Sequence, residues 1–417
     1  MFEFGRDLRK IFAQARHSED LGWVELIGVD LLKIEARREA TDAGRVSCAH
    51  PFETEHRAAA LWRDHARRTG AADSLDRAER CADSLMRSAV GGDQTALAAV
   101  DKGLTLLLRF DLCGDPVHLD RALDALDAVT PPRKSRLDAA LTSARTRVAA
   151  RQARLSDRPG ALAEAAAGLD AARRAAGADD VDLRMDAAML ALEAGVIQRD
   201  VGLLDRAGRD LGALVEAASP DHRPLTRARA LALCGAGLSA LAAVAGHEEA
   251  RTQGRIMFDA AADQFTPDHS PLDWAAIQML RASDDALPMM ALAEAEALTQ
   301  GNGLIIGALV RERRGSREVA LAEAVRDPAG LETLEQRLRA RMATAGPLDW
   351  VADQIVMGEV VLARRRMDGR ASSTLAPSNL ASGSLGLILS EAAVTAREMG
   401  VPALVERAER LLETARG

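Results

Sequence analysis

The tetrapeptide Leu-Asp-Arg-Ala occurs three times in this chain, at residues 75–78, 119–122 and 204–207. The first two copies start 44 residues apart, and the third starts 85 residues later, close to twice that spacing. A similar apolar stretch, Leu-Ala-Glu-Ala at residues 162–165, opens where a period of about 43 residues places another copy. Such a period is typical of stacked repeats, each burying its apolar face against its neighbours. The spacing therefore predicts a repeat array.

The composition favours helices. Hydrophobic residues make up 48% of the chain but aromatic residues only 3%, and there is no tyrosine. Alanine and leucine must therefore build the core, and both are strong helix formers, whereas strands favour aromatic and β-branched residues. At 417 residues the chain also exceeds the size at which single cores usually stop growing. We expect an all-α protein with an elongated array.

Residues 93–113 and 116–129 show the expected unit, two helices separated by Gly-Asp-Pro. Each helix carries apolar residues at spacings of three and four, which places them on one face. These residues are Leu104, Leu107, Leu108 and Phe110 in the first helix and Leu119, Ala122, Leu123 and Leu126 in the second. Further pairs are expected at 134–157 with 159–176, 181–199 with 201–218, and 224–245 with 247–264.

A second string, Pro-Leu-Asp-Trp, stands at residues 271–274 and again at 347–350. Proline is tolerated in a first helical turn, aspartate there complements the helix dipole, and tryptophan anchors the helix against a neighbour. This helix start, followed by a second helix containing Leu-x-x-Ala, resembles the tetratricopeptide-type repeats in their longer unit of a little over 40 residues. The resemblance is clearest over residues 75–300, and the chain departs from it in lacking the usual tyrosine.

The resemblance implies an α-solenoid of stacked antiparallel helix pairs. We expect four parts along the chain. They are an N-terminal helical cap region at 1–70, the repeat array at 71–366, a loop at 367–384 and C-terminal capping helices at 385–417. The loop is long for a repeat turn, and long loops are often functional.

Charge and targeting signals narrow the class of protein. The net charge of -8 argues against a generic nucleic-acid binder, which has a basic patch on a basic domain. No long apolar run and no signal-peptide pattern is present, so neither a membrane span nor secretion is expected. The four cysteines are widely spaced without a Cys-x-x-Cys pair, which favours a reduced cytoplasmic protein.

Motifs of the common enzyme classes do not occur: there is no phosphate-binding glycine loop, nucleophile elbow or His-Glu-x-x-His. We therefore predict a protein that is not an enzyme and has no cofactor or metal. The sequence contains one cluster of possible metal ligands. Because of this cluster, a metal-dependent enzyme remains as the least favoured alternative. The residues of the cluster are Cys48, His50, Glu53 and His56, with His65 further along. They lack the paired spacing of structural zinc sites, so a loop and a helix start explain them better.

Two charged or amphipathic features have two explanations each. An apolar stripe near the N-terminus, flanked by basic residues, suits a capping helix on the first repeat or a helix that touches a partner or membrane surface. The stripe consists of Phe4, Leu8, Ile11, Phe12 and Ala15.

Arginines gather at 311–314, 337–341 and 364–366, where they could bind an acidic partner. Nearby acidic residues favour charge compensation between helices.

The leading functional prediction is a protein–protein interaction scaffold or adaptor. In a solenoid the first helix of each pair lines a concave surface, where a peptide or protein partner would bind. The resemblance makes Arg109, Asp111, Gln278, Arg281 and Gln354 the candidate binding residues. The alternative is a regulatory sensor that closes around a small ligand or signalling peptide. A deep pocket with convergent polar groups would favour that alternative.

Overall fold

The structure is a computed structural model that describes residues 21–130, 132–156, 158, 160–176, 181–281, 289–300, 304–371 and 379–416. The described residues form eighteen α-helices and one short 3-10 helix, η1, with no strand among them. The all-α prediction is confirmed. The apolar stripe predicted near the N-terminus lies outside the described residues.

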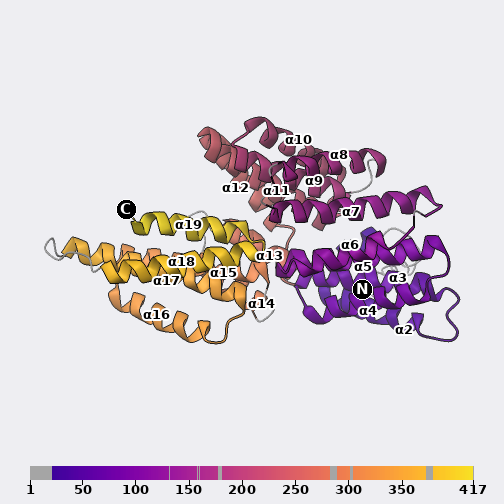
Figure 1. Cartoon of the computed structure of the whole chain (residues 1–417), viewed down its shortest axis with the longest axis horizontal. Helices are drawn as coiled ribbons and strands as arrows, with labels where there is room; N and C mark the ends of the chain where they lie inside the picture. Colours follow the sequence, from indigo (N-terminus) through magenta and orange to yellow (C-terminus); the bar gives the residue numbers. More distant parts are fainter. Residues whose placement is uncertain are drawn as a thin grey trace, which may run out of the picture.

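The helices form three groups that meet near the centre of the molecule (Figure 1). The N-terminal group contains η1 (Leu21–Leu26), α2 (Val29–Ala43), α3 (Pro51–Thr69), α4 (Ala72–Ser88), α5 (Gly92–Cys113) and α6 (Val117–Asp127). The middle group contains α7 (Ser135–Leu155), α8 (Ala161–Ala176), α9 (Val181–Gln198), α10 (Val201–Ala217), α11 (Pro224–Ala245) and α12 (Glu248–Ala262). The C-terminal group contains α13 (Pro271–Arg281), α14 (Met289–Thr299), α15 (Ile305–Ala324), α16 (Pro328–Met342), α17 (Pro347–Ala371), α18 (Asn379–Glu398) and α19 (Pro402–Arg416).

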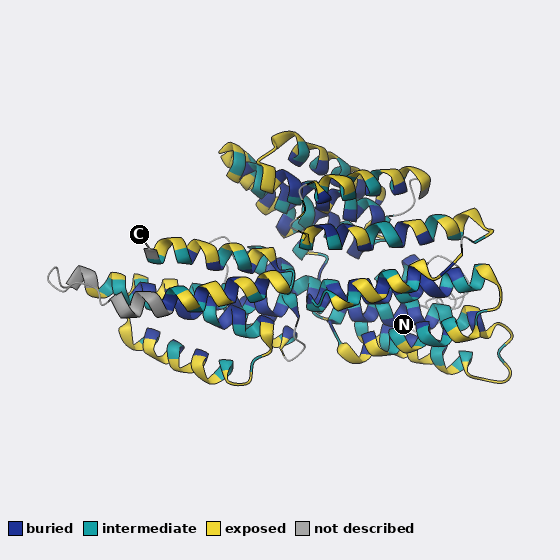
Figure 2. Ribbon diagram, viewed as in Figure 1, coloured by how far each residue is buried: buried dark blue, intermediate teal, exposed yellow. Residues whose placement is uncertain are grey.

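Helices pack mostly in sequential pairs. From α3 with α4 through α13 with α14, each odd-numbered helix contacts the helix that follows it. The pattern changes in the C-terminal group, where α15 packs mainly against α17. Figure 2 shows the buried residues along the faces where the helices of each group meet. The packing is consistent with a helical array.

The repeated tetrapeptide lies on α4, α6 and α10, each the second helix of its pair. Its leucine and alanine are buried in all three copies, because they face the neighbouring helices. The charged residues of the tetrapeptide reach across to adjacent helices: Asp76 pairs with Arg109 at 2.7 Å and Arg121 with Glu79 at 2.5 Å. The tetrapeptide thus marks the buried face of the three second helices that carry it, as its apolar pattern predicts.

The Pro-Leu-Asp-Trp strings mark helix starts, as predicted. Helix α13 begins at Pro271 and α17 at Pro347. The aspartate of each string pairs with an arginine of another helix, Asp273 with Arg229 at 2.6 Å and Asp349 with Arg311 at 3.2 Å. The string therefore both starts a helix and ties it to its neighbours.

Helices occupy both ends of the stretch 367–384, where a loop is expected from the sequence. Helix α17 continues to Ala371 and α18 begins at Asn379, and residues 372–378 lie outside the described part. Glycine and serine lower helix propensity by less than about 1 kcal/mol each, which neighbouring alanines and leucines offset. A Gly- and Ser-rich segment can therefore still be helical.

Glycines allow the N-terminal and C-terminal groups to approach closely. Gly114, at the end of α5, has a φ of +80°, and a Cβ there would collide with the carbonyl oxygen of Met399 in the turn between α18 and α19. A Cβ on Gly70, at the end of α3, would collide with Leu304 before α15. The ends of α3 and α5 thus touch the C-terminal group directly.

Helix α11 is long and apolar enough to cross a membrane by length and composition, the one such helix in the described residues. Buried helices of other proteins also meet this criterion. Here α11 packs between α10 and α12, and part of its surface lines the central cavity.

Candidate functional site: a central cavity

A cavity of about 1110 Å³ lies where the three helix groups meet. Its wall comes mainly from α3, α5, α7, α9, α11 and α15, with η1 and the start of α19. From α3 to α11 these are the first helices of successive pairs, as expected for the inner face of an array. Residues up to 381 positions apart in the chain therefore share one wall, from Gly22 to Ala403.

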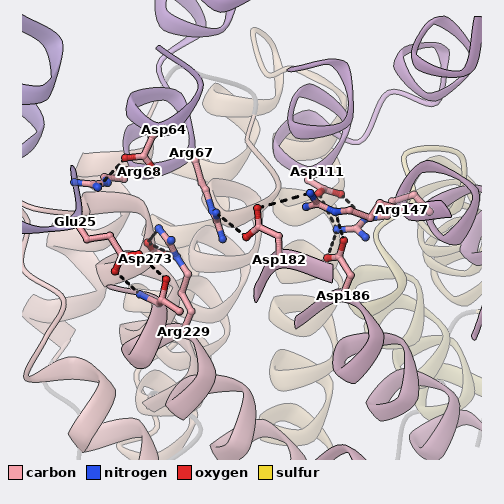
Figure 3. A network of polar contacts seen from close by, with 12 residues as sticks. Glu25, Asp64, Arg67, Arg68, Asp111, Arg147, Asp182, Asp186, Arg229 and Asp273 are labelled. Carbon is pink, nitrogen blue, oxygen red and sulfur yellow. Dashed lines mark hydrogen bonds and ion pairs between the residues drawn. The ribbon is translucent and has the colours of Figure 1, made fainter. Parts of the chain in front are cut away.

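One part of the wall is a tightly closed set of ion pairs between α5, α7 and α9 (Figure 3). The Arg151 guanidinium donates to both oxygens of Asp111 at 3.1 Å and to Asp186 at 2.8 Å. Arg147 donates to the other oxygen of Asp186 at 2.5 Å. Burial acts to raise the pKa of the Asp186 carboxyl, but the two guanidinium groups outweigh it and hold that pKa below its usual range. Asp186 is therefore a charged, fully engaged part of the wall.

The row of ion pairs continues from α9 to α3, where the contacts are longer. Asp182, one helical turn before Asp186 on α9, accepts a hydrogen bond from Arg67 at 3.4 Å and lies 3.7 Å from Arg147. Burial acts to raise the pKa of the Asp182 carboxyl, but the guanidinium groups of Arg67, Arg147 and Arg229 outweigh it and lower that pKa. The Arg67–Asp182 pair links the N-terminal group to the middle group across the cavity.

The η1 helix closes one side of the cavity. Glu25 accepts hydrogen bonds from the backbone N–H of Thr226 at 2.8 Å and from its hydroxyl at 2.5 Å, at the first turn of α11. Arg68 is fully buried and donates to the carbonyl oxygens of Val24 and Ile27, both at 2.9 Å. These bonds hold η1 between α3 and α11. The Glu25 carboxylate is favourable in this place because the N-terminus of a helix attracts an acidic side chain.

Apolar residues cover the rest of the wall. They include Leu104, Leu107 and Leu108 of α5, Val181, Met185 and Met189 of α9, and Ile305, Ile306 and Leu309 of α15. Met189 is the most open of these, with 39% of its surface exposed. The charged residues of the wall are nearly balanced, seven arginines against six acidic residues. The cavity therefore combines apolar patches with paired charges and has little net charge.

The predicted binding residues fall in different places. Asp111 lines the cavity. Arg109 faces away from it and pairs with Asp76 at 2.7 Å. Gln278 is buried on α13, where it accepts a 3.5 Å hydrogen bond from Arg281. Arg281 also pairs with Asp259 at 3.0 Å, and Gln354 is a partly buried residue of α17 outside the cavity wall.

Apart from Asp111, the arginines and aspartates that form the ion pairs of the wall were not among the predicted residues. The available signal is the matched spacing of four residues in Arg147 and Arg151 on α7 and in Asp182 and Asp186 on α9. Residues at this spacing share one helix face, so two such helices can pair charge to charge. The spacing alone does not say which helices face each other.

The possible metal ligands are engaged separately. Cys48 Sγ lies 3.5 Å from the Thr54 hydroxyl, and His65 Nδ1 lies 2.8 Å from the Ser74 hydroxyl. His56 Nδ1 pairs with the buried carboxylate of Asp101. In the described part of the chain, no group of three or more His, Cys, Asp or Glu side chains is placed to hold a metal ion.

The arginine clusters of the C-terminal group are compensated by nearby acidic residues, as favoured from the sequence. Glu296 alone contacts three of them, Arg311, Arg314 and Arg341. Other pairs are Arg337 with Glu318, Arg339 and Arg364 with Glu335, and Arg366 with Glu323.

Comparisons with known proteins give no family. No protein-family model matches the chain, and a search of curated proteins finds no significant match. The geometry of the cavity is therefore the basis for a functional proposal.

Proposed function

We propose that this chain is a non-enzymatic, tetratricopeptide-like α-solenoid that receives a peptide segment of a protein partner in its central cavity. The observation that carries the proposal is the composition of the cavity wall. The first helices of five successive pairs contribute to it: α3, α5, α7, α9 and α11. In solenoids of helix pairs the inner surface is the usual binding surface.

The repeat-like features support the solenoid part of the proposal. The period of the Leu-Asp-Arg-Ala strings, their burial on second helices and the sequential packing of pairs all agree with a unit of two helices. A unit of this kind buries its apolar face only when its neighbours stack against it.

The size and chemistry of the cavity favour a peptide. At about 1110 Å³ it lies at the upper limit for small-molecule sites, which are usually about 300 to 1,000 Å³. Its nearly balanced charges do not suit a polyanion such as nucleic acid, which needs an excess of basic residues. Paired charges beside apolar patches match a peptide, whose backbone offers donors and acceptors and whose side chains are partly apolar.

A regulatory sensor for a small ligand is the second candidate. The convergence of ion pairs from four helices on one cavity favours it, because precisely placed polar groups are typical of small-molecule sites. The two candidates share the cavity and differ in its occupant.

A cavity-filling variant tests the proposal. Met189→Trp places a large side chain in the cavity, whereas Ile197→Trp, two turns later on the same helix and 64% exposed, places it outside. Each variant replaces the native protein in its own cells and is purified with whatever binds to it. We expect a partner protein to copurify with the wild type and with Ile197→Trp, and at least tenfold less with Met189→Trp. A partner that copurifies equally with both variants would contradict the proposal, and a small molecule in place of a protein would support the second candidate.

A further inference from the structure

The Arg67–Asp182 pair is the open part of the cavity wall. The Arg67 side chain is 35% exposed and the Asp182 side chain 45%, against 9% and 6% for Arg151 and Asp186 in the closed part. One 3.4 Å hydrogen bond joins the open pair. A partly exposed ion pair with such a long contact contributes little to stability, so the fold depends little on it.

Both side chains line the cavity, point toward one another (Figure 3) and retain hydrogen-bonding capacity. A guanidinium has five N–H donors and a carboxylate about four acceptor positions. The bond between Arg67 and Asp182 uses one of each. A donor and an acceptor with spare capacity therefore lie side by side at this point.

The charges around the pair select the kind of group that fits. A ligand anion at Arg67 would be repelled by Asp182, and a ligand cation at Asp182 would be repelled by Arg67 and Arg147. A neutral group with an acceptor beside a donor satisfies both side chains without repulsion. In an extended peptide, the N–H and C=O of one residue point to the same side, as they do toward a neighbouring antiparallel strand.

On the basis of the proposed function, we propose that Arg67 and Asp182 bind the backbone of one residue in an extended peptide segment. Arg67 donates to its C=O, and Asp182 accepts from its N–H. The flanking residues of the peptide direct apolar side chains onto Val181 and Met185, which stand beside Asp182 on α9 and line the same cavity. The pair therefore selects an extended, uncharged and apolar segment of the partner. It binds the backbone of this segment rather than a charged side chain.

A random library of 12-residue peptides, displayed on phage and selected against the purified full chain, supplies the probe. The enriched peptides are synthesised, and their Kd values are measured for the wild type, Arg67→Leu, Arg67→Lys and Asp182→Ala. We expect Arg67→Leu and Asp182→Ala each to weaken binding about tenfold or more, because hydrogen bonds to charged groups contribute that much. The control is Arg158→Leu, which removes an exposed arginine paired with Glu164 outside the cavity and should leave the Kd unchanged. Circular dichroism and the unfolding midpoint establish that each variant is folded.

Methylation of single backbone nitrogens in the peptide separates backbone recognition from side-chain recognition. We expect one peptide position at which N-methylation weakens binding about tenfold to the wild type but little to Asp182→Ala, because both changes remove the same hydrogen bond. If the peptides bind at a site that Met189→Trp blocks, but Arg67→Leu, Asp182→Ala and N-methylation leave their Kd unchanged, this inference is wrong and the proposed function stands. The inference is equally wrong if an acidic side chain of the peptide, and no backbone N–H, is essential for binding. If no library peptide binds, or if Met189→Trp has no effect on those that do, the proposed peptide site itself is wrong.

Discussion

Glu25 and Thr226 are 201 residues apart in the chain, yet Glu25 accepts a 2.8 Å hydrogen bond from the Thr226 backbone N–H. This contact brings the start of the described chain against the first turn of α11 and closes one side of the central cavity. It is one of several long-range links that hold the three helix groups around that cavity.

Removal of the Glu25 carboxylate should weaken this closure. Glu25→Ala leaves the first turn of α11 without its acceptor, which typically costs about 1 to 2 kcal/mol. Urea unfolding measures the loss, and hydrogen exchange should become faster at residues 224–230. The exposed neighbour Leu26 provides the control, since Leu26→Ala on the same short helix should change neither quantity. Equal effects of the two variants would show that the link does not stabilise the fold.

Asp186 should be far more important to stability than a surface aspartate. Asp186→Asn leaves the guanidinium groups of Arg147 and Arg151 in the buried wall with one charged partner fewer, for a cost of about 3 kcal/mol. Asp205→Asn breaks an exposed pair with Arg209 and should cost less than about 0.5 kcal/mol. Denaturant unfolding of both variants tests the contrast, and similar midpoints would contradict the importance of the buried ion pairs.

Much of the fold was predictable because local patterns decide it. The Leu-Asp-Arg-Ala strings and the prolines at 271 and 347 act within one helix and its immediate neighbour, so they indicate the helix pairs and their buried faces. The site was less predictable. Asp111 was predicted and lines the cavity, whereas Arg67 and Asp182 meet only because helices 115 residues apart face each other.

Gly114 should tolerate alanine less well than Gly246 does. Both have a positive φ, +80° and +72°, so alanine strains the backbone at either position by about 1 kcal/mol. A Cβ at Gly246 meets open space, but at Gly114 it meets the Met399 carbonyl of the C-terminal group. We expect Gly114→Ala to cost at least about 1 kcal/mol more than Gly246→Ala in unfolding experiments. Equal costs would mean that α5 does not press against the turn between α18 and α19.

The stability of the protein should depend on pH through His65. Burial lowers the pKa of its imidazole to about 4 from an ordinary value of 6.5. Between these values the unfolded chain binds a proton that the folded chain does not, so stability falls as the pH decreases from about 6.5 to about 4. The full contribution of this group is about 3 kcal/mol.

His65→Gln removes the titrating group and keeps a polar side chain near Ser74. The difference in unfolding free energy between wild type and variant should shrink or reverse as the pH is lowered from 7 to 4.5. His222→Gln, at an exposed histidine, serves as the control. A difference between wild type and His65→Gln that does not change with pH would contradict the burial of a neutral His65.

Site-specific photo-cross-linking in the native cells tests the central claim most directly. A photoreactive amino acid at position 189 faces the cavity, and the same residue at position 197 lies outside it on α9. We expect position 189 to cross-link to one short segment of a single partner protein, identified by mass spectrometry, and position 197 not to do so. No protein adduct at position 189, or the same adducts at both positions, would contradict the claim that the central cavity receives a peptide.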